Sequence, residues 1–213
     1  MRPPDDLRAA PVTLAIAALT AAAWLIAWLP GWSQSAAVEA GFIPARVAGL
    51  PNDVLHVPVA LTPLTATLVH SGLPHLAVSL FFLLFSGRSV EKVLGRAGMI
   101  ILYLVGAYAA AAAQYAVAPH SVAPLIGAGG AISAPLGAYA LLFSRNRGKT
   151  ANHRLATLLH ALWLAAAWIG VELLVGLTFE TSGERFPVAA YAAGFLVGML
   201  LAKPLLLLKW RGA

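Results

Sequence analysis

Long apolar runs separated by short polar segments dominate the chain. The first run, from about residue 11 to residue 29, exceeds the roughly 7–15 apolar residues of a signal peptide, and three tryptophans stand near its far end. We expect an uncleaved membrane-spanning helix there, with a cleaved signal peptide as the weaker alternative. Five more runs are read as spans, at about 68–86, 97–117, 125–143, 155–178 and 187–208.

The segment between the first two runs, from about 31 to 64, is more polar and is interrupted by prolines that break regular helix. Its apolar pieces suggest that it lies on, or dips into, the membrane surface as a long first external loop. No second domain is visible in the sequence. We therefore expect an all-α integral membrane protein, a bundle of six transmembrane helices in one domain over residues 1–213.

Composition supports a lipid-exposed body. Of 213 residues, 60% are hydrophobic and only 10% are charged, whereas a soluble domain needs roughly 25% charged residues to cover its surface. The chain contains no cysteine, so the sequence offers no disulfide, thiolate metal site or thiol nucleophile. The net charge of +6 does not indicate nucleic-acid binding, because no basic stripe is interleaved with aromatic residues.

The placement of the basic residues predicts an orientation. Six spans put both termini on one side of the membrane, and that side receives every lysine and arginine except Arg46 and Arg185, which is 12 of the 14. Cytoplasmic loops carry such an excess in membrane proteins. We therefore expect a multi-pass protein of the bacterial inner membrane with both termini in the cytoplasm. Membrane lipids are its first expected partners, and the cluster that begins at Arg145 could contact anionic headgroups.

Small and polar residues recur at fixed spacings at the ends of these runs. They are His70 and His75 at the second run, Gly87, Glu91 and Gly95 after it, Gly127, Gly129 and Gly130 at the start of the fourth, and Gly194 and Gly198 in the sixth. Their order and spacing resemble those of the rhomboid family of intramembrane serine proteases, over about residues 11 to 202. The resemblance implies a rhomboid-like six-helix fold with a lateral opening between the second and fifth helices.

The same resemblance places the catalytic positions. Active members carry a serine third in a Gly-x-Ser-Gly motif on the fourth helix, and a histidine before the Gly-x-x-x-Gly stretch of the sixth. Here these positions hold Gly129 and Tyr191. A histidine and an asparagine four residues later help to bind the oxyanion in the family. Here His75 is kept and Ser79 replaces the asparagine, so the oxyanion region is expected to be vestigial.

These replacements remove the chemistry of the protease. Glycine has no side chain to attack a peptide, and a phenol stays protonated at neutral pH and is a poor base. Losing such a nucleophile typically costs about 10⁶-fold in turnover. The sequence therefore predicts a pseudoprotease, a serine-protease fold without a catalytic residue. Ser133 lies on the same helix face as Gly129, but the sixth run has no histidine to serve it, so a relocated nucleophile is the less favoured alternative.

Tyr191 invites a structural hypothesis. We expect its ring to fill the space that Gly129 leaves, with its hydroxyl bonded to His75 or to a backbone carbonyl near Gly127; packing alone is the alternative. We also expect Ser79 to be able to accept a hydrogen bond from His75.

Two carboxylates lie in or beside the spans. Glu172, about six residues inside the fifth span, would contact a partner helix or form a proton-linked site, unless it is near enough to the interface to be hydrated or neutralised. Glu91 is expected to cap or to pair locally with Arg88 or Lys92. The five-residue spacing of His70 and His75 is not that of a helical metal pair, so no metal or cofactor is expected.

These observations favour a catalytically inactive, rhomboid-like protein that recognises or holds transmembrane helices of other proteins. The first alternative is a structural scaffold subunit of a larger, stable membrane complex. The second is an intramembrane serine protease with a relocated nucleophile. Binding of other proteins is thus the expected activity, without nucleic acid.

Overall fold

The computed structural model describes residues 10–29, 31–49, 57–144, 153–178 and 187–211. These ranges are helical apart from connecting segments and one isolated antiparallel bridge between Phe42 and Leu125. The helices are α1 (Pro11–Trp28), α2 (Ser33–Ala40), α3 (Pro44–Val47), α4 (Thr62–Thr65), α5 (Leu73–Phe82), α6 (Arg88–Val117), α7 (Gly129–Leu142), α8 (His153–Thr178) and α9 (Val188–Arg211). Short 3₁₀ turns occur at Val59–Leu61 and Ala66–Leu68, and a π-helical turn at Leu83–Gly87 joins α5 to α6.

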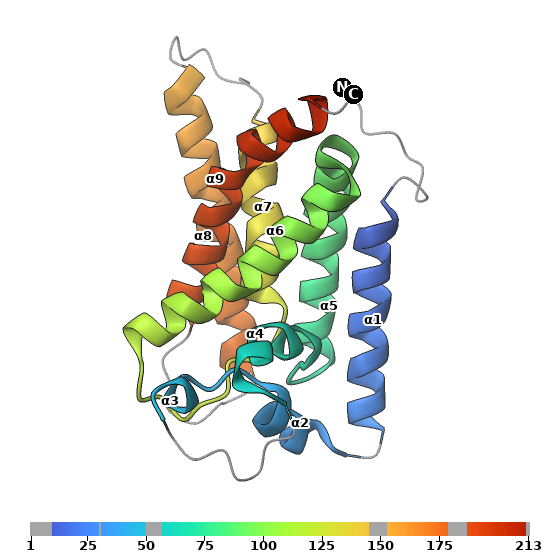
Figure 1. The fold of residues 1–213 in the computed structure, drawn as a ribbon, viewed down its shortest axis with the longest axis vertical. Helices are drawn as coiled ribbons and strands as arrows, with labels where there is room; N and C mark the ends of the chain where they lie inside the picture. The colour runs from blue at the N-terminus through green and yellow to red at the C-terminus, as the bar shows by residue number, and fades with distance from the viewer. Residues whose placement is uncertain (1–9, 30, 50–56, 145–152, 179–186, 212–213) are drawn as a thin grey trace.

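The spanning helices form an all-α bundle, as the sequence predicts. Within the described ranges, four stretches are long and apolar enough to cross a membrane: Pro11–Trp28, Leu73–Val117, Leu155–Leu177 and Val188–Lys209. The second of these contains two antiparallel passes, so that α5 runs toward one end of the bundle and most of α6 runs back (Figure 1). The start of α1 and the end of α9 lie at that same end, and α2, α3 and α4 lie at the other (Figure 1).

Gly95 makes the reversal between these two passes. Its φ of 80° and ψ of 175° interrupt α6, and a positive φ of this kind favours glycine because it has no Cβ. Lys209 of α9 donates from Nζ to the carbonyls of Lys92 and Val93, at 3.3 and 2.8 Å, which satisfies acceptors at the end of the first pass. The span expected at 68–86 thus corresponds to a helix that begins at Leu73 and continues beyond Ser86 to this turn.

Glu91 joins the same end of the bundle to α1. We expected it to cap or to pair locally with Arg88 or Lys92; its carboxylate does cap a helix, and that helix, α1, lies 78 to 79 positions earlier in the chain. It accepts hydrogen bonds from the backbone N–H groups of Val12 and Thr13, at 2.9 and 2.7 Å, and from the Thr13 hydroxyl at 2.7 Å. The first N–H groups of a helix lack partners within the helix and favour a nearby negative charge, which explains this arrangement.

The short helix α7 forms the centre of the bundle. Its 14 residues rise about 21 Å, and most of its side chains are buried. Glycines let α9 approach it closely: a Cβ added at Gly194 or Gly198 would overlap the carbonyl oxygens of Gly130 and Ala134. Small residues at four-residue spacing allow such contact between membrane helices. The α7–α9 pair is therefore the rigid core against which the other helices are placed.

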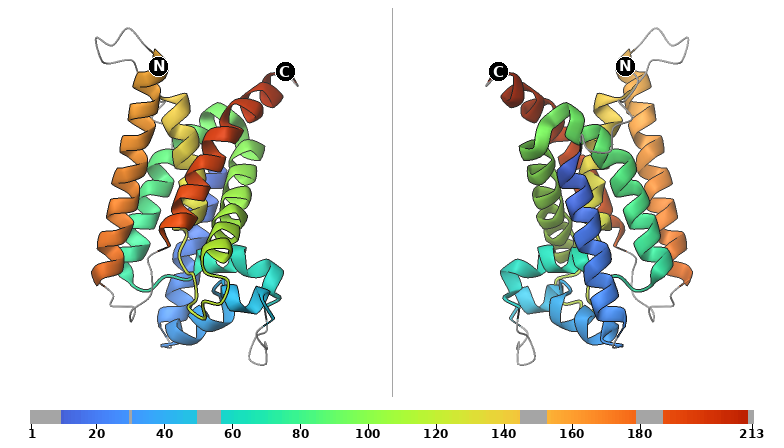
Figure 2. Two further views of the ribbon diagram at one scale, coloured as in Figure 1. Left: turned by 90° about the vertical axis from the view of Figure 1, so that its left-hand side faces the viewer. Right: turned by 90° about the vertical axis from the view of Figure 1, so that its right-hand side faces the viewer.

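Helix α8, like α1, buries few of its side chains in the bundle. It lies at the edge of the bundle in both views of Figure 2, and among its described side chains only Ala161, Trp168 and Glu172 are buried. Large apolar residues such as Leu162, Trp163 and Leu174 are exposed and would face lipid. Helix α8 is thus held to the bundle by a narrow stripe of contacts, and two of its three buried residues belong to the site described next.

Candidate functional site

Gly129 and Tyr191 meet where α7 and α9 begin. Gly129 is the first residue of α7, and Tyr191 lies in the first turn of α9. A Cβ placed on Gly129 would lie 2.7 Å from Cε1 of Tyr191 and 3.2 Å from Oε2 of Glu172. The phenol ring, only 7% exposed, therefore occupies the space that a side chain at position 129 would need.

The hydroxyl of Tyr191 finds its partner on α8. It donates a hydrogen bond to the carboxyl group of Glu172, and not to His75 or to a carbonyl near Gly127, as we had expected. The reason is that Glu172 is 4% exposed and points into the bundle. A carboxylate is a stronger acceptor than a backbone carbonyl. Burial also removes the interpretation of Glu172 as a hydrated interfacial carboxylate.

His75 completes this cluster from α5. Its Nε2 lies 3.9 Å from Oε2 of Glu172, and its Nδ1 lies 3.1 Å from the hydroxyl oxygen of Ser71. The imidazole packs on Gly127, whose φ is 97° and where a Cβ would come within 2.5 Å of the ring. A continuous row of polar groups, Ser71, His75, Glu172 and Tyr191, therefore runs from an exposed serine to the position opposite Gly129.

The second histidine supports this arrangement. The rings of His70 and His75 are 4.9 Å apart, edge to face, and Nε2 of His70 accepts a long hydrogen bond of 3.5 Å from the backbone N–H of Ala128. The loop before α7 is also tied to the first loop, because Gly127 N–H donates to the carbonyl of Ala66 at 3.0 Å. His70 thus helps to order the segment that leads into Gly129.

Ser79 does not behave as expected. Its hydroxyl is fully buried and has no hydrogen-bond partner in the described part of the chain. The expected bond from His75 does not form, since one ring nitrogen of His75 contacts Ser71 and the other approaches Glu172. Ser79 therefore carries a buried hydroxyl, able to donate or to accept, that is unpaired within the described residues.

The hydroxyl of Ser133 makes two structural hydrogen bonds, one as donor and one as acceptor. Its hydroxyl donates to the carbonyl of Gly129 at 2.8 Å and accepts from Nε1 of Trp168 at 2.7 Å, and the residue is completely buried. Trp168 also packs on the rings of Phe82 and Tyr191. Sequence reasoning missed Trp168, although a tryptophan four residues before a buried carboxylate lies on the same helix face and was the available signal.

The comparison with known families settles the fold. The profile of the rhomboid domain matches residues 60–208, well over half of the 213 residues. The chain belongs to the rhomboid family. A search of curated proteins finds no significant match. The match extends from just before α4 to near the end of α9, so it contains every residue of the cluster described above.

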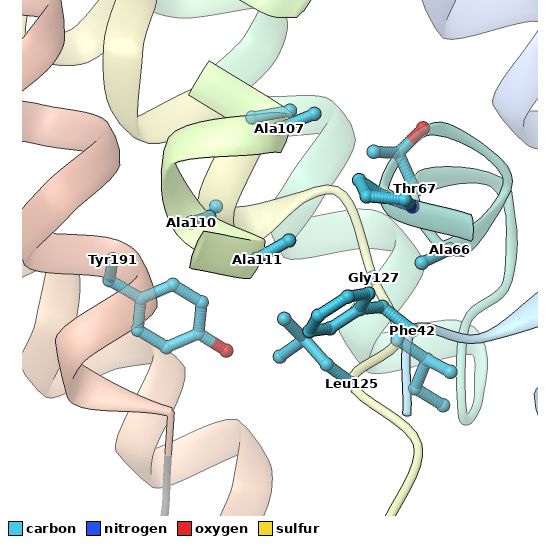
Figure 3. Close-up of a pocket in the computed structure, with 13 residues that line it drawn as sticks. Phe42, Ala66, Thr67, Ala107, Ala110, Ala111, Leu125, Gly127 and Tyr191 are labelled. Atoms are coloured by element: carbon cyan, nitrogen blue, oxygen red, sulfur yellow. The ribbon is translucent and has the colours of Figure 1, made fainter. Parts of the chain in front are cut away.

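In this rhomboid the region around the dyad positions is closely packed. The cavity that Tyr191 lines together with Gly127 and Gly130 has a volume of about 20 Å³, room for about one water molecule. Figure 3 shows the phenol reaching from α9 toward Leu125 and Gly127, with the alanines of α6 beside it. Among the described residues, no group of three or more histidine, aspartate or glutamate side chains could hold a metal ion.

Proposed function

We propose that this rhomboid is catalytically inactive and that it binds or holds transmembrane helices of other membrane proteins. The observation that supports the proposal most strongly is the contact between Gly129 and Tyr191. A serine placed at 129 would collide with the phenol ring, so the two replacements fit each other. They make one packed unit where the family's dyad would be.

The surrounding chemistry supports inactivity. Intramembrane proteolysis through a serine needs a hydroxyl and a base that can take its proton. Ser133, the nearest hydroxyl on α7, bonds a backbone carbonyl and an indole N–H, neither of which is a base. The Tyr191 hydroxyl donates its hydrogen bond to Glu172, so it is not positioned as a base for a serine. The dyad positions are therefore occupied by a structural hydrogen-bond network.

The expected binding route is the lateral opening between α5 and α8 that the family fold implies. Helix α8 has few buried residues, and its main link to α5 in the apolar core is the contact between Phe82 and Trp168, whose rings are 4.5 Å apart. A loosely held helix at the edge of a bundle can move aside at lower cost than a central one. The placement of 12 of 14 basic residues supports a bacterial inner-membrane location with cytoplasmic termini.

Crosslinking from within the membrane tests this function. A photoreactive amino acid at Val78 of α5 or Leu164 of α8, both partly buried and packed against the core cluster that contains Trp168, should capture single-span proteins in native membranes. The same probe at Leu19 of α1, which is exposed on another helix, serves as the control. Equal capture from all three positions would refute binding at the opening. One protein captured in stoichiometric amount would favour a fixed scaffold subunit instead of exchanging clients.

One contact favours a second candidate, a relocated serine hydrolase. Ser71, His75 and Glu172 follow one another in the order of a catalytic triad, with the Ser71 hydroxyl 3.1 Å from the imidazole. The 3.9 Å between His75 and Glu172 is longer than a hydrogen bond, and serines near helix starts commonly bond locally. We therefore favour inactivity. Cleavage of a model transmembrane substrate that is lost in Ser71→Ala and retained in Ser133→Ala would establish the hydrolase.

A further inference from the structure

The carboxyl group of Glu172 uses only part of its hydrogen-bonding capacity. It accepts from the phenol of Tyr191, and its Oε2 lies 3.9 Å from His75, but its Oε1 has no hydrogen-bond partner among the described residues. A carboxylate offers about four acceptor positions. At 4% exposure, the unused positions are shielded from water as well. Glu172 is therefore a buried acceptor that still lacks a donor.

A second unpaired polar group, a hydroxyl, lies on α5. The Ser79 hydroxyl of α5 is fully buried and unpaired in the described part of the protein, and it lies one helical turn after His75, which faces Glu172. Buried polar groups in native proteins are almost always paired, and unpaired ones are costly. These two unpaired groups lie on α5 and α8, the two helices between which the family fold implies the lateral opening.

Position in the membrane narrows the kind of partner. Glu172 lies six positions before Thr178, the last residue of α8, which puts it about 9 Å along the helix from that end. Carboxylates at such depth are rare and pair with opposite charges or with other polar groups. The polar groups that face Glu172 from the described elements are His75 of α5 and Tyr191 of α9; neither is a lysine or arginine. A lysine or arginine side chain would supply both the missing donor and the opposite charge.

We propose that Glu172 is the recognition residue of the helix-binding site and selects transmembrane helices with a lysine or arginine about six residues from the corresponding end. This inference rests on the proposed function, since it names the client that the opening between α5 and α8 accepts. When α8 moves away from α5, the bound helix brings its ammonium or guanidinium group to Oε1 of Glu172. The Tyr191 hydroxyl holds the carboxyl group in place from the other side.

Designed single-span helices test this selection directly. The full-length protein in lipid nanodiscs, with the photoreactive residue at Val78, is mixed with leucine–alanine helices that carry Lys, Gln, Leu or Glu at the sixth position from the matching end. We expect about tenfold more crosslinked product for the Lys helix than for the Leu helix, with Glu lowest. A Lys helix with the charge moved to its middle should behave like the Leu helix.

Variants of α8 assign the selection to one residue. Glu172→Leu should abolish the preference for Lys over Leu, and Glu172→Gln should do the same with a polar side chain of similar volume. The matched control is Gly170→Ala on the same helix, where an added Cβ would meet no atom within 4 Å; it should keep the full preference. Thermal unfolding of each variant verifies that it is folded.

The possible failures are distinct. If all four helices crosslink equally in the unmodified protein, or if the Lys preference survives Glu172→Leu, the recognition role is wrong and helix binding stands. If no helix of any kind crosslinks, the proposed function fails and this inference fails with it.

Discussion

Two buried glutamates, Glu91 and Glu172, differ in how completely their carboxylate oxygens are hydrogen-bonded. Glu91, 2% exposed, accepts three hydrogen bonds from the start of α1, so its charge is well compensated. Glu172, 4% exposed, has one phenol, a distant imidazole and an oxygen without a partner in the described chain. The first makes a complete structural joint at one end of the bundle. The second is an incomplete polar site at the other end, and such a site is where a ligand is to be sought.

The largest effect should come from breaking the complete joint. Glu91→Ala removes the acceptor of three buried donors, and hydrogen bonds to a charged group contribute about 1.5–3 kcal/mol each. Allowing for relaxation of α1, we expect a loss of about 3 kcal/mol in the free energy of unfolding. Denaturant titration in detergent measures it. Thr13→Val, which removes one donor of the three, should cost about 1 kcal/mol; no loss in either variant would contradict the cap.

Filling the space at the incomplete site should cost somewhat less. Gly129→Ser puts an atom 2.7 Å from the Tyr191 ring, and overpacking of this kind costs about 1–3 kcal/mol. The cost should fall below about 1 kcal/mol when Tyr191→Ala is already present, because the two sites are coupled. Gly170→Ala is the control without a neighbour. Additive effects of the two substitutions, measured by the same titration, would show that the ring does not fill the site.

A smaller loss should follow the removal of the hydroxyl that joins α7 to α8. Ser133→Ala leaves the buried indole N–H of Trp168 without its acceptor, which costs about 1–2 kcal/mol. The double variant with Trp168→Phe should cost less than the sum of the single substitutions, since the orphaned donor is then gone. An unchanged free energy of unfolding in Ser133→Ala would contradict a structural role for this hydroxyl. Ser133 would then have to be tested as the relocated nucleophile.

The smallest change in the free energy of unfolding is expected at Glu172 and Tyr191, although both side chains are buried. The double variant Glu172→Leu, Tyr191→Phe removes both partners of the phenol–carboxyl bond together with the unpaired oxygen. Replacing a buried polar pair by apolar residues of similar size is often close to neutral. We expect a change within about 1 kcal/mol in unfolding titrations. A loss as large as that of Glu91→Ala would make Glu172 a second structural joint and would remove the reason to expect a ligand there.

Much of the fold follows from hydrophobic patterning, and the reasons are local. Apolar runs predict the membrane helices, and the reversal at Gly95 coincides with a glycine whose backbone conformation few other residues adopt. The partners of the two glutamates could not be predicted in this way. Glu91 reaches α1 across 78 to 79 positions, and Glu172 meets Tyr191 only because α8 and α9 converge on α7. Such contacts depend on how the helices pack in space, which the hydrophobic periodicity of the sequence does not predict.

Gly129 and Tyr191 alone lead to the prediction that the dyad positions are vestigial, but they do not predict which groups the replacing side chain contacts. The sequence indicates that a phenol could fill the gap at Gly129. It does not predict that the Tyr191 hydroxyl bonds Glu172 and not His75, because this depends on how far along the bundle each helix places its side chain. Ser79 shows the same limit: its spacing from His75 favours a bond, yet the orientation of the imidazole directs both nitrogens elsewhere.

Activity-based labelling tests the central claim most directly. The purified full-length protein, in lipid and beside an active rhomboid protease as positive control, is treated with a fluorophosphonate probe and examined by mass spectrometry. We predict no covalent adduct on any serine, because Gly129 supplies no nucleophile and Ser133 is bonded to Trp168. A stoichiometric adduct at Ser71 or Ser133, together with turnover that the corresponding alanine variant abolishes, would contradict the account.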